Sequence, residues 1–175
     1  VFESAITLIE ENRLYYRGVD ALELARSQSF ETVAMLLWGV QPEAGDFFAR
    51  ATSPLSAWNQ QFIKPPSELR LRTIDRFQIV LPMAAALDPA AFNFEASAVA
   101  LCGARILRLL ATIASEGQTA ETIAQQLQQA WTRDDAIVPL INSALILCAD
   151  HELNASSFTA RCAASAGSTP YAVVN

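Results

Sequence analysis

The sequence contains little histidine, little cysteine and little positive charge. Its 175 residues include one histidine and three cysteines, and 12 Lys and Arg stand against 18 Asp and Glu, for a net charge of -6. An acidic chain has no general positive field that would hold nucleic acid or an anionic membrane, so we expect neither as a partner of this segment. Cys148 is the only other His or Cys close to His151 in the sequence that could bind a metal ion. We therefore expect no metal site.

The three cysteines are odd in number and widely spaced, at Cys102, Cys148 and Cys162. This pattern does not form a disulfide framework and is typical of a protein from a reducing compartment. Each cysteine has apolar sequence neighbours, which predicts a small buried hydrophobic residue rather than a nucleophile. We therefore expect a cytoplasmic location and no thiol chemistry.

Long uninterrupted hydrophobic runs are also scarce. The apolar stretch at residues 136–149 is broken by Pro139, Asn142 and Ser143, and it is shorter than a bilayer span requires. Hydrophobic residues nevertheless make up 52% of the chain, enough for a sizeable core in one domain. The sequence predicts a folded, soluble domain without a membrane segment.

The first half of the chain predicts a hairpin followed by helices. Residues 5–9 are rich in β-branched and apolar side chains, and residues 13–16 follow a short polar turn, which favours two strands. From Ser29 to Gly39 apolar residues recur at helical spacing, so Ser29 is the expected N-cap and Gly39 the expected stop. Prolines crowd residues 41–89, where we expect short helices joined by loops.

The second half predicts further helices. Residues 96–116 have a helical apolar period and small residues around Gly103 that allow another helix to approach. Thr119 is the expected cap of a helix whose glutamines point to solvent and whose apolar face contains Ile123, Leu127, Ala130 and Trp131. Asp134 or Asp135 is the expected cap of the next helix, and Asn154 of a last one over residues 155–166.

His151 lies in the predicted connector between these last two helices. Asp150, Glu152, Asn154 and Ser156 surround it with carboxylate, amide and hydroxyl groups. An imidazole exchanges protons near neutral pH, and the free amides at the start of the next helix favour a carboxylate ligand. Two interpretations remain open at this point. His151 is a helix-end or core residue without further function, or Asp150 or Glu152 holds it so that it donates a hydrogen bond to such a ligand.

The His151 segment resembles the citrate synthases. Residues 149–156 (ADHELNAS), 157–161 (SFTAR) and 164–165 (AS) resemble the family segment that ends one helix, carries an oxaloacetate-binding histidine and begins the next helix. A second block, at the start of the chain, resembles the family's opening hairpin and first helix in order and spacing. This block consists of residues 3–7 (ESAIT), 14–18 (LYYRG), 24–25 (LA) and 29–31 (SFE).

The resemblance implies an all-α fold, the citrate synthase-like large domain, incomplete over residues 1–175. A hairpin at residues 1–18 would precede helices over residues 19–175, with the small domain and the remaining large-domain helices absent. The implied enzyme condenses acetyl-CoA, or propionyl-CoA, with oxaloacetate to give citrate, or 2-methylcitrate, and CoA. It works as a homodimer without a metal or redox cofactor.

The resemblance also implies roles for three residues. His151 would bind oxaloacetate and polarise its carbonyl, where negative charge develops on oxygen. Asn154 would support substrate binding, and Ser156 would orient a second histidine that enolises the thioester. In the family that histidine, a third histidine, an aspartate base and substrate-binding arginines follow the equivalent of Asn175. We therefore expect this chain to be a piece of a longer protein and to be inactive alone.

Two departures from the family pattern support a second hypothesis. Residues 79–83 (IVLPM) stand where the family usually has His-Pro-Met, and Cys148 stands where many members have another histidine. A divergent member of this kind is alternatively a non-catalytic module of a regulator, which senses a carboxylate or serves for dimerisation. Arg17 and Arg161 are candidates for substrate contact, but the expected role of Arg17 is a structural ion pair, and Arg161 is expected to be solvated or to form an interhelical pair.

Overall fold

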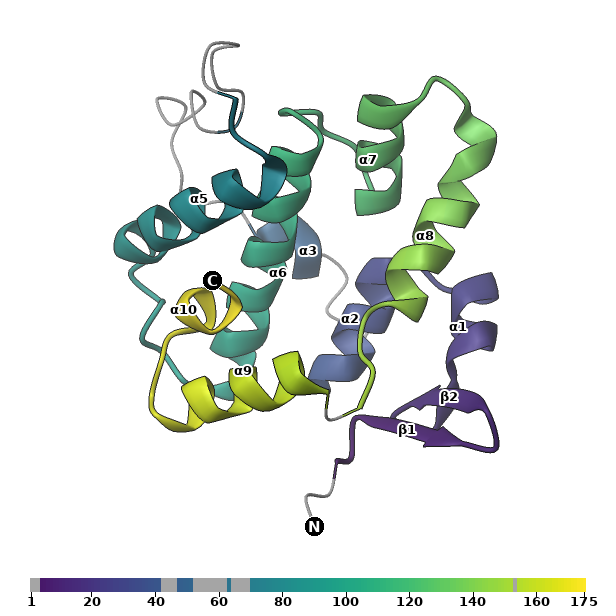
Figure 1. Ribbon diagram of the computed structural model, residues 1–175, viewed down its shortest axis with the longest axis horizontal. Helices are drawn as coiled ribbons and strands as arrows, with labels where there is room; N and C mark the ends of the chain where they lie inside the picture. Colours follow the sequence, from purple (N-terminus) through teal and green to yellow (C-terminus); the bar gives the residue numbers. More distant parts are fainter. Residues whose placement is uncertain (1–3, 42–46, 52–62, 64–69, 153) are drawn as a thin grey trace.

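The computed structural model describes residues 4–41, 47–51, 63, 70–152 and 154–175. A small sheet of β1 (Thr7–Glu10), β2 (Arg13–Tyr16) and β3 (Val19–Asp20) precedes the helices, and it lies at the edge of the molecule beside α1 (Figure 1). The described helices are α1 (Ala21–Ser27), α2 (Phe30–Trp38), α3 (Phe47–Arg50), α5 (Thr73–Leu87), α6 (Ala96–Ala114), α7 (Ile123–Trp131), the short 3-10 helix η2 (Asp135–Ile137), α8 (Val138–Leu147), α9 (Ala155–Ser165) and α10 (Pro170–Val174). The expected helical fold with an N-terminal hairpin is confirmed.

The sheet is antiparallel, with strand order β1-β2-β3 and Thr7 opposite Tyr16. Glu11 and Asn12 at its first turn have φ of 49° and 61°, the left-handed conformation that a tight two-residue hairpin turn requires. The third strand was not expected. It forms because Arg17 and Gly18, with φ of 47° and 84°, reverse the chain a second time.

Local signals begin and end the first helices. Asp20 caps α1 and accepts hydrogen bonds from the amides of the first turn, while Ser29 caps α2 as expected. Gly39 ends α2 with a φ of 72°, which also confirms the expected stop. The close approach expected at Gly103 is made by the ring of Trp38, because a Cβ placed there would lie 2.9 Å from Trp38 Cζ2.

The long helix α5 contradicts the expectation that residues 41–89 form only short helices. It has 15 residues and contains Pro82, which removes one helical hydrogen bond at a cost of about 3 kcal/mol. Val80, Leu81 and Ala84 are buried in a cluster with side chains of α6 and α10, and this burial offsets the lost bond. Within the same stretch, residues 42–46, 52–62 and 64–69 lie outside the described residues.

The expectation about membrane segments overlooked α6. This helix has 19 residues and a hydropathy of 1.6, long and apolar enough by composition to cross a bilayer. It is also the central helix of the fold, with Ile106, Leu109 and Ile113 buried against neighbouring helices. Its Arg108 donates a hydrogen bond to the carbonyl of Phe48, 3.0 Å away. In its most apolar window 39% is buried inside the domain, so packing accounts for part of its composition.

The helix after α6 differs from its prediction in two ways. Thr122, rather than Thr119, caps α7, because Gln125 completes a reciprocal capping box with it. Gln126 and Gln128 are buried, whereas the expected core residue Trp131 is 61% exposed. The burial of Gln126 is possible because its amide group donates to three oxygens, the nearest being Gln118 O at 2.7 Å.

The last helices begin where the sequence indicated. Asp134 caps η2, which runs directly into α8, and Asn154 caps α9. Gly167, with a φ of 82°, follows the end of α9. Ser168 and Thr169 then lead into α10, which packs against α5, α6 and α9.

Candidate functional site

His151 lies in the connector between α8 and α9, as predicted. Its side chain is exposed, and it forms no hydrogen bond or ion pair with the other described residues. The connector begins where α8 ends at Leu147 and finishes at the N-cap of α9. The imidazole is therefore accessible to a ligand and is not part of the core.

The carboxylates on either side of His151 do not hold it, so that part of the second interpretation is wrong. Asp150 accepts a hydrogen bond from the hydroxyl of Thr7 and another, at 3.3 Å, from Ser157 Oγ. Glu152 Oε1 accepts the backbone N–H of Ile9 at 2.7 Å. Both carboxylates are bound by donors, and the N-terminal hairpin supplies the main ones. No local periodicity indicates such pairings, because they join residues 143 positions apart.

Tyr16 of β2 binds the backbone of the connector. Its ring is fully buried, and its hydroxyl donates to the carbonyls of Ile146 and Asp150 at 2.9 and 3.2 Å. Burial raises the pKa of Tyr16, although its hydrogen bonds to the backbone of Asp150 and Ala149 act in the opposite direction. The hydroxyl therefore stays protonated and satisfies carbonyls that the end of α8 leaves free.

The other two predicted site residues lie at the start of α9. Asn154 Oδ1 accepts the N–H of Ser157 at 2.8 Å, so its side chain is occupied by the cap. Ser156 is exposed in the first turn of the same helix. His151, Asn154 and Ser156 thus share one end of one helix, but no hydrogen bond among the described residues joins them to one another.

Arg17 and Arg161 have structural roles, but neither forms an ion pair with another described residue. The guanidinium of Arg17 donates twice to the carbonyl of Leu37, at 3.0 and 2.8 Å, near the end of α2. Arg161 donates to Ser4 Oγ at 3.1 Å, which adds a further link between α9 and the N-terminal segment. Both arginines therefore tie helices to the start of the chain.

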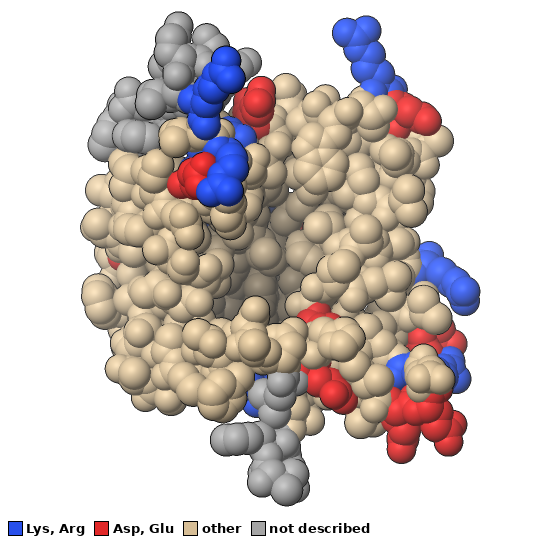
Figure 2. Space-filling model, in the orientation of Figure 1, with Lys and Arg blue, Asp and Glu red and all other residues tan. Residues whose placement is uncertain are grey.

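An apolar groove of about 720 Å³ lies between α2, α6, α9 and α10. Its walls include Trp38, Ile106, Val173 and the side chain of Arg17, and His151 is not among its lining residues. Figure 2 shows this side of the molecule hollowed near its centre, with charged side chains gathered mainly around the periphery. The groove offers apolar contacts but few polar groups that would select a ligand.

Of the three cysteines, which were all expected to be buried, one is buried and two are exposed. Cys102 is buried on α6, and burial together with the nearby negative charge of Asp88 raises the pKa of its thiol to about 11. Cys148 and Cys162 are exposed, contrary to prediction, because one ends α8 and the other lies on the outer side of α9. Among the described residues no group of three or more His, Cys, Asp or Glu side chains is placed to hold a metal ion.

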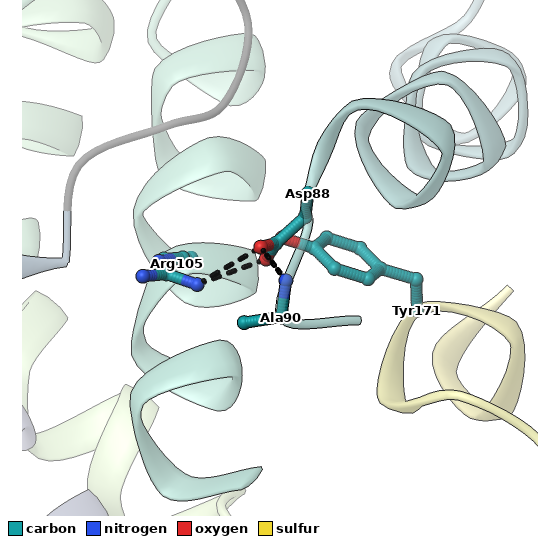
Figure 3. A network of polar contacts seen from close by, with 4 residues as sticks. All are labelled: Asp88, Ala90, Arg105 and Tyr171. Atoms are coloured by element: carbon teal, nitrogen blue, oxygen red, sulfur yellow. Dashed lines mark hydrogen bonds and ion pairs between the residues drawn. The ribbon is translucent and has the colours of Figure 1, made fainter. Parts of the chain in front are cut away.

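Sequence reasoning missed a buried polar network between α5, α6 and α10 (Figure 3). Asp88 accepts hydrogen bonds from Arg105 Nη1 at 3.0 and 3.1 Å, from the N–H of Ala90 at 2.9 Å and from the hydroxyl of Tyr171 at 2.8 Å. The Asp88 side chain is 3% exposed. Burial and the hydrogen bond to Asp88 raise the pKa of Tyr171. The carboxylate is fully occupied, so this network is structural.

The family model of the citrate synthase C-terminal domain matches residues 1–175, the whole chain. The chain belongs to the citrate synthase family. Solved citrate synthases have a similar fold. The crystal structure of citrate synthase from Thermotoga maritima MSB8 superposes with a TM-score of 0.74 at 22% sequence identity, over 99% of this chain and 51% of that one.

Citrate synthase from Pyrobaculum aerophilum gives the same TM-score of 0.74 at 21% identity, again over 99% of this chain and 51% of the other. The chain therefore spans about half the length of these citrate synthases. No curated protein sequence matches it significantly.

Proposed function

We propose that this chain is part of a citrate synthase-like acyltransferase and that His151 belongs to its oxaloacetate site. The reaction joins the methyl carbon of acetyl-CoA, or the carbon next to the thioester carbonyl of propionyl-CoA, to the carbonyl carbon of oxaloacetate. Hydrolysis of the thioester then releases CoA. It requires no metal or redox cofactor. Membership of the family supports the reaction class, and the resemblance around residues 149–156 supports the assignment of His151.

The exposed imidazole of His151 is the observation that carries this proposal. It is the only histidine of the chain, and no described side chain competes for its ring nitrogens. An imidazole N–H next to the substrate carbonyl stabilises the negative charge that develops on that oxygen during carbon–carbon bond formation. The N-terminus of α9, which begins four residues later, adds a partial positive charge that favours an anionic ligand.

Asn154 and Ser156 support the site in this proposal. The Asn154 cap fixes the start of α9 and hence the direction in which the connector enters the helix. Ser156 presents a hydroxyl to a second histidine supplied elsewhere in the enzyme. Turnover therefore requires groups that these 175 residues do not contain, and we expect no synthase activity from them alone.

The test is a CoA-release assay on the full-length protein with oxaloacetate and either acetyl-CoA or propionyl-CoA. We expect release by the wild-type protein and a loss of at least 100-fold, or about 2.7 kcal/mol of transition-state stabilisation, in His151→Ala. Absence of release with both thioesters would contradict the enzyme and leave a carboxylate-sensing or dimerisation module as the function.

We also infer that the protein works as a homodimer, as the family resemblance implies. Helix α9 supports this because none of its described residues is buried, although the helix is rich in alanine. Light scattering coupled to gel filtration of the full-length protein tests the inference, and a monomer at micromolar concentration would contradict it.

A further inference from the structure

The N-terminal hairpin binds both carboxylates beside His151, and we propose that it is the positioning element for this imidazole. The Thr7 hydroxyl binds Asp150, the Ile9 amide binds Glu152, and the Tyr16 hydroxyl binds the connector backbone. The inference rests on the proposed oxaloacetate-binding role of His151. It adds that Thr7 and Tyr16, which do not touch the substrate, set the geometry around the ring.

The register of the hairpin places these contacts on one surface. Thr7 and Tyr16 are direct partners across β1 and β2, and cross-strand partners project to the same face of a sheet. Thr7 is 4% and Tyr16 0% exposed, so both are covered by the elements they contact. The connector is therefore pinned at two adjacent points of one strand pair.

The third contact uses the free edge of the sheet. Strand β1 is the outer strand in the order β1-β2-β3, so alternate N–H groups of β1 have no partner within the sheet. Glu152 binds such a group on Ile9 at 2.7 Å. Glu152 itself has a φ of 51°, an uncommon conformation for a residue with a side chain, and the tertiary contact holds it there.

The bound carboxylates affect how a ligand can reach the imidazole. Asp150 and Glu152 are the immediate neighbours of His151, and an unbound carboxylate at either position would compete with a dicarboxylate for the imidazole. Donors from the hairpin occupy both carboxylates. The ring nitrogens of His151 therefore remain available.

A pair of substitutions at Thr7 tests the proposal on the full 175-residue chain. Thr7→Val removes the hydroxyl at nearly constant shape, and Thr7→Ser keeps it. Thr159→Val is the matched control, because it removes a hydroxyl that bonds within α9, to the carbonyl of Ala155. The readouts are amide hydrogen exchange of Ile9 and residues 148–152, and the NMR signal of the single imidazole.

We expect about tenfold faster exchange in the connector and a displaced imidazole signal for Thr7→Val, since a hydrogen bond to a charged group contributes about 1.5 kcal/mol or more. Thr7→Ser and Thr159→Val should match the wild type. A second pair, Glu152→Met against Glu152→Gln, provides the same comparison if Thr7→Val does not fold. Wild-type exchange in both Thr7→Val and Glu152→Met, or an equal rise in Thr159→Val, would overturn the proposal.

Titration of the full-length protein with oxaloacetate separates this inference from the proposed function. If His151→Ala binds oxaloacetate as tightly as the wild type, the binding role of His151 is contradicted, and the exchange data still decide whether the hairpin orders the connector. If His151→Ala loses binding, we expect several-fold weaker binding in Thr7→Val and wild-type binding in Thr7→Ser. Equal affinity in all variants would contradict a positioning role.

Discussion

The Asp88 network and the His151 connector are two polar regions in a largely apolar chain. Around Asp88 a buried carboxylate meets a guanidinium, a phenol and a backbone amide, and each group satisfies another (Figure 3). Around His151 both carboxylates also accept hydrogen bonds, but the imidazole between them is exposed and has no described partner. In the first region the polar groups bind one another, whereas in the second the imidazole of His151 remains without a described partner.

This difference separates a structural polar site from a candidate binding site. A buried charge is tolerated only when it is paired and hydrogen-bonded, so a complete network indicates a contribution to packing geometry. An exposed titratable ring at a helix junction, with its neighbours already bound, retains its hydrogen-bonding capacity for a ligand. Substitutions in the two regions should therefore affect different properties.

The largest effect on stability is expected at Asp88. Asp88→Ala leaves the Arg105 guanidinium and the Tyr171 hydroxyl without their acceptor, which should lower the free energy of unfolding by about 3–5 kcal/mol. Urea denaturation followed by circular dichroism measures it. Arg72→Ala is the control, because Arg72 pairs with Asp75 at the surface and its removal should change stability little. Equal effects of the two substitutions would contradict the structural role of the Asp88 network.

Alkaline pH should destabilise the same buried region. Burial raises the pKa of Cys102 to about 11 and also raises that of Tyr171, so the folded chain keeps both groups protonated after the unfolded chain has ionised them. The unfolded state then binds fewer protons, and stability falls as pH rises above about 9. Thermal melts between pH 8 and 11 should show this decline, and Tyr171→Phe should make it shallower. A pH-independent melting temperature over that range would contradict the prediction.

Tyr16→Phe should produce an intermediate effect that is specific to the connector. Loss of the hydroxyl leaves the carbonyls of Ile146 and Asp150 without this donor, at a cost of about 1–2 kcal/mol. Chemical denaturation gives the total, and hydrogen exchange shows whether residues 146–152 are affected most. Tyr15→Phe is the comparison, since Tyr15 is on the neighbouring position of β2 and packs beneath Arg13. A uniform change across the whole chain would count against a local role.

The smallest effect on stability is expected for His151→Ala. An exposed side chain without a partner contributes little, so the free energy of unfolding should change by less than about 0.5 kcal/mol. Oxaloacetate binding, measured by calorimetry on the full-length protein, should nevertheless be lost. A strongly destabilised variant would show that His151 supports the fold instead.

Much of the architecture could be predicted because its signals are local. Ser29, Gly39 and Asn154 act at the helix ends where they stand, through caps and a left-handed stop that involve a few neighbouring residues. The position of His151 between two helices follows from the same signals. Its functional role remains a prediction that rests on the family resemblance.

The errors share a non-local cause. Gln126 is buried because Thr112, Ser115 and Gln118 supply acceptors from the preceding helix and loop, and Pro82 is tolerated because α6 and α10 cover α5. Asp88 is 17 residues from Arg105 and 83 from Tyr171, so no periodicity in the sequence connects them. The hairpin contacts to Asp150 and Glu152 escaped prediction for the same reason.

The contacts of the hairpin also have a consequence for the order of folding. Tyr16 meets Ile146 across 130 residues, and Ser4 meets Arg161 across 157. Closing loops of this length is entropically costly and slow compared with forming the helices between them. During synthesis the hairpin emerges before the connector that it contacts, so the neighbourhood of His151 should become ordered only after the helical core has assembled.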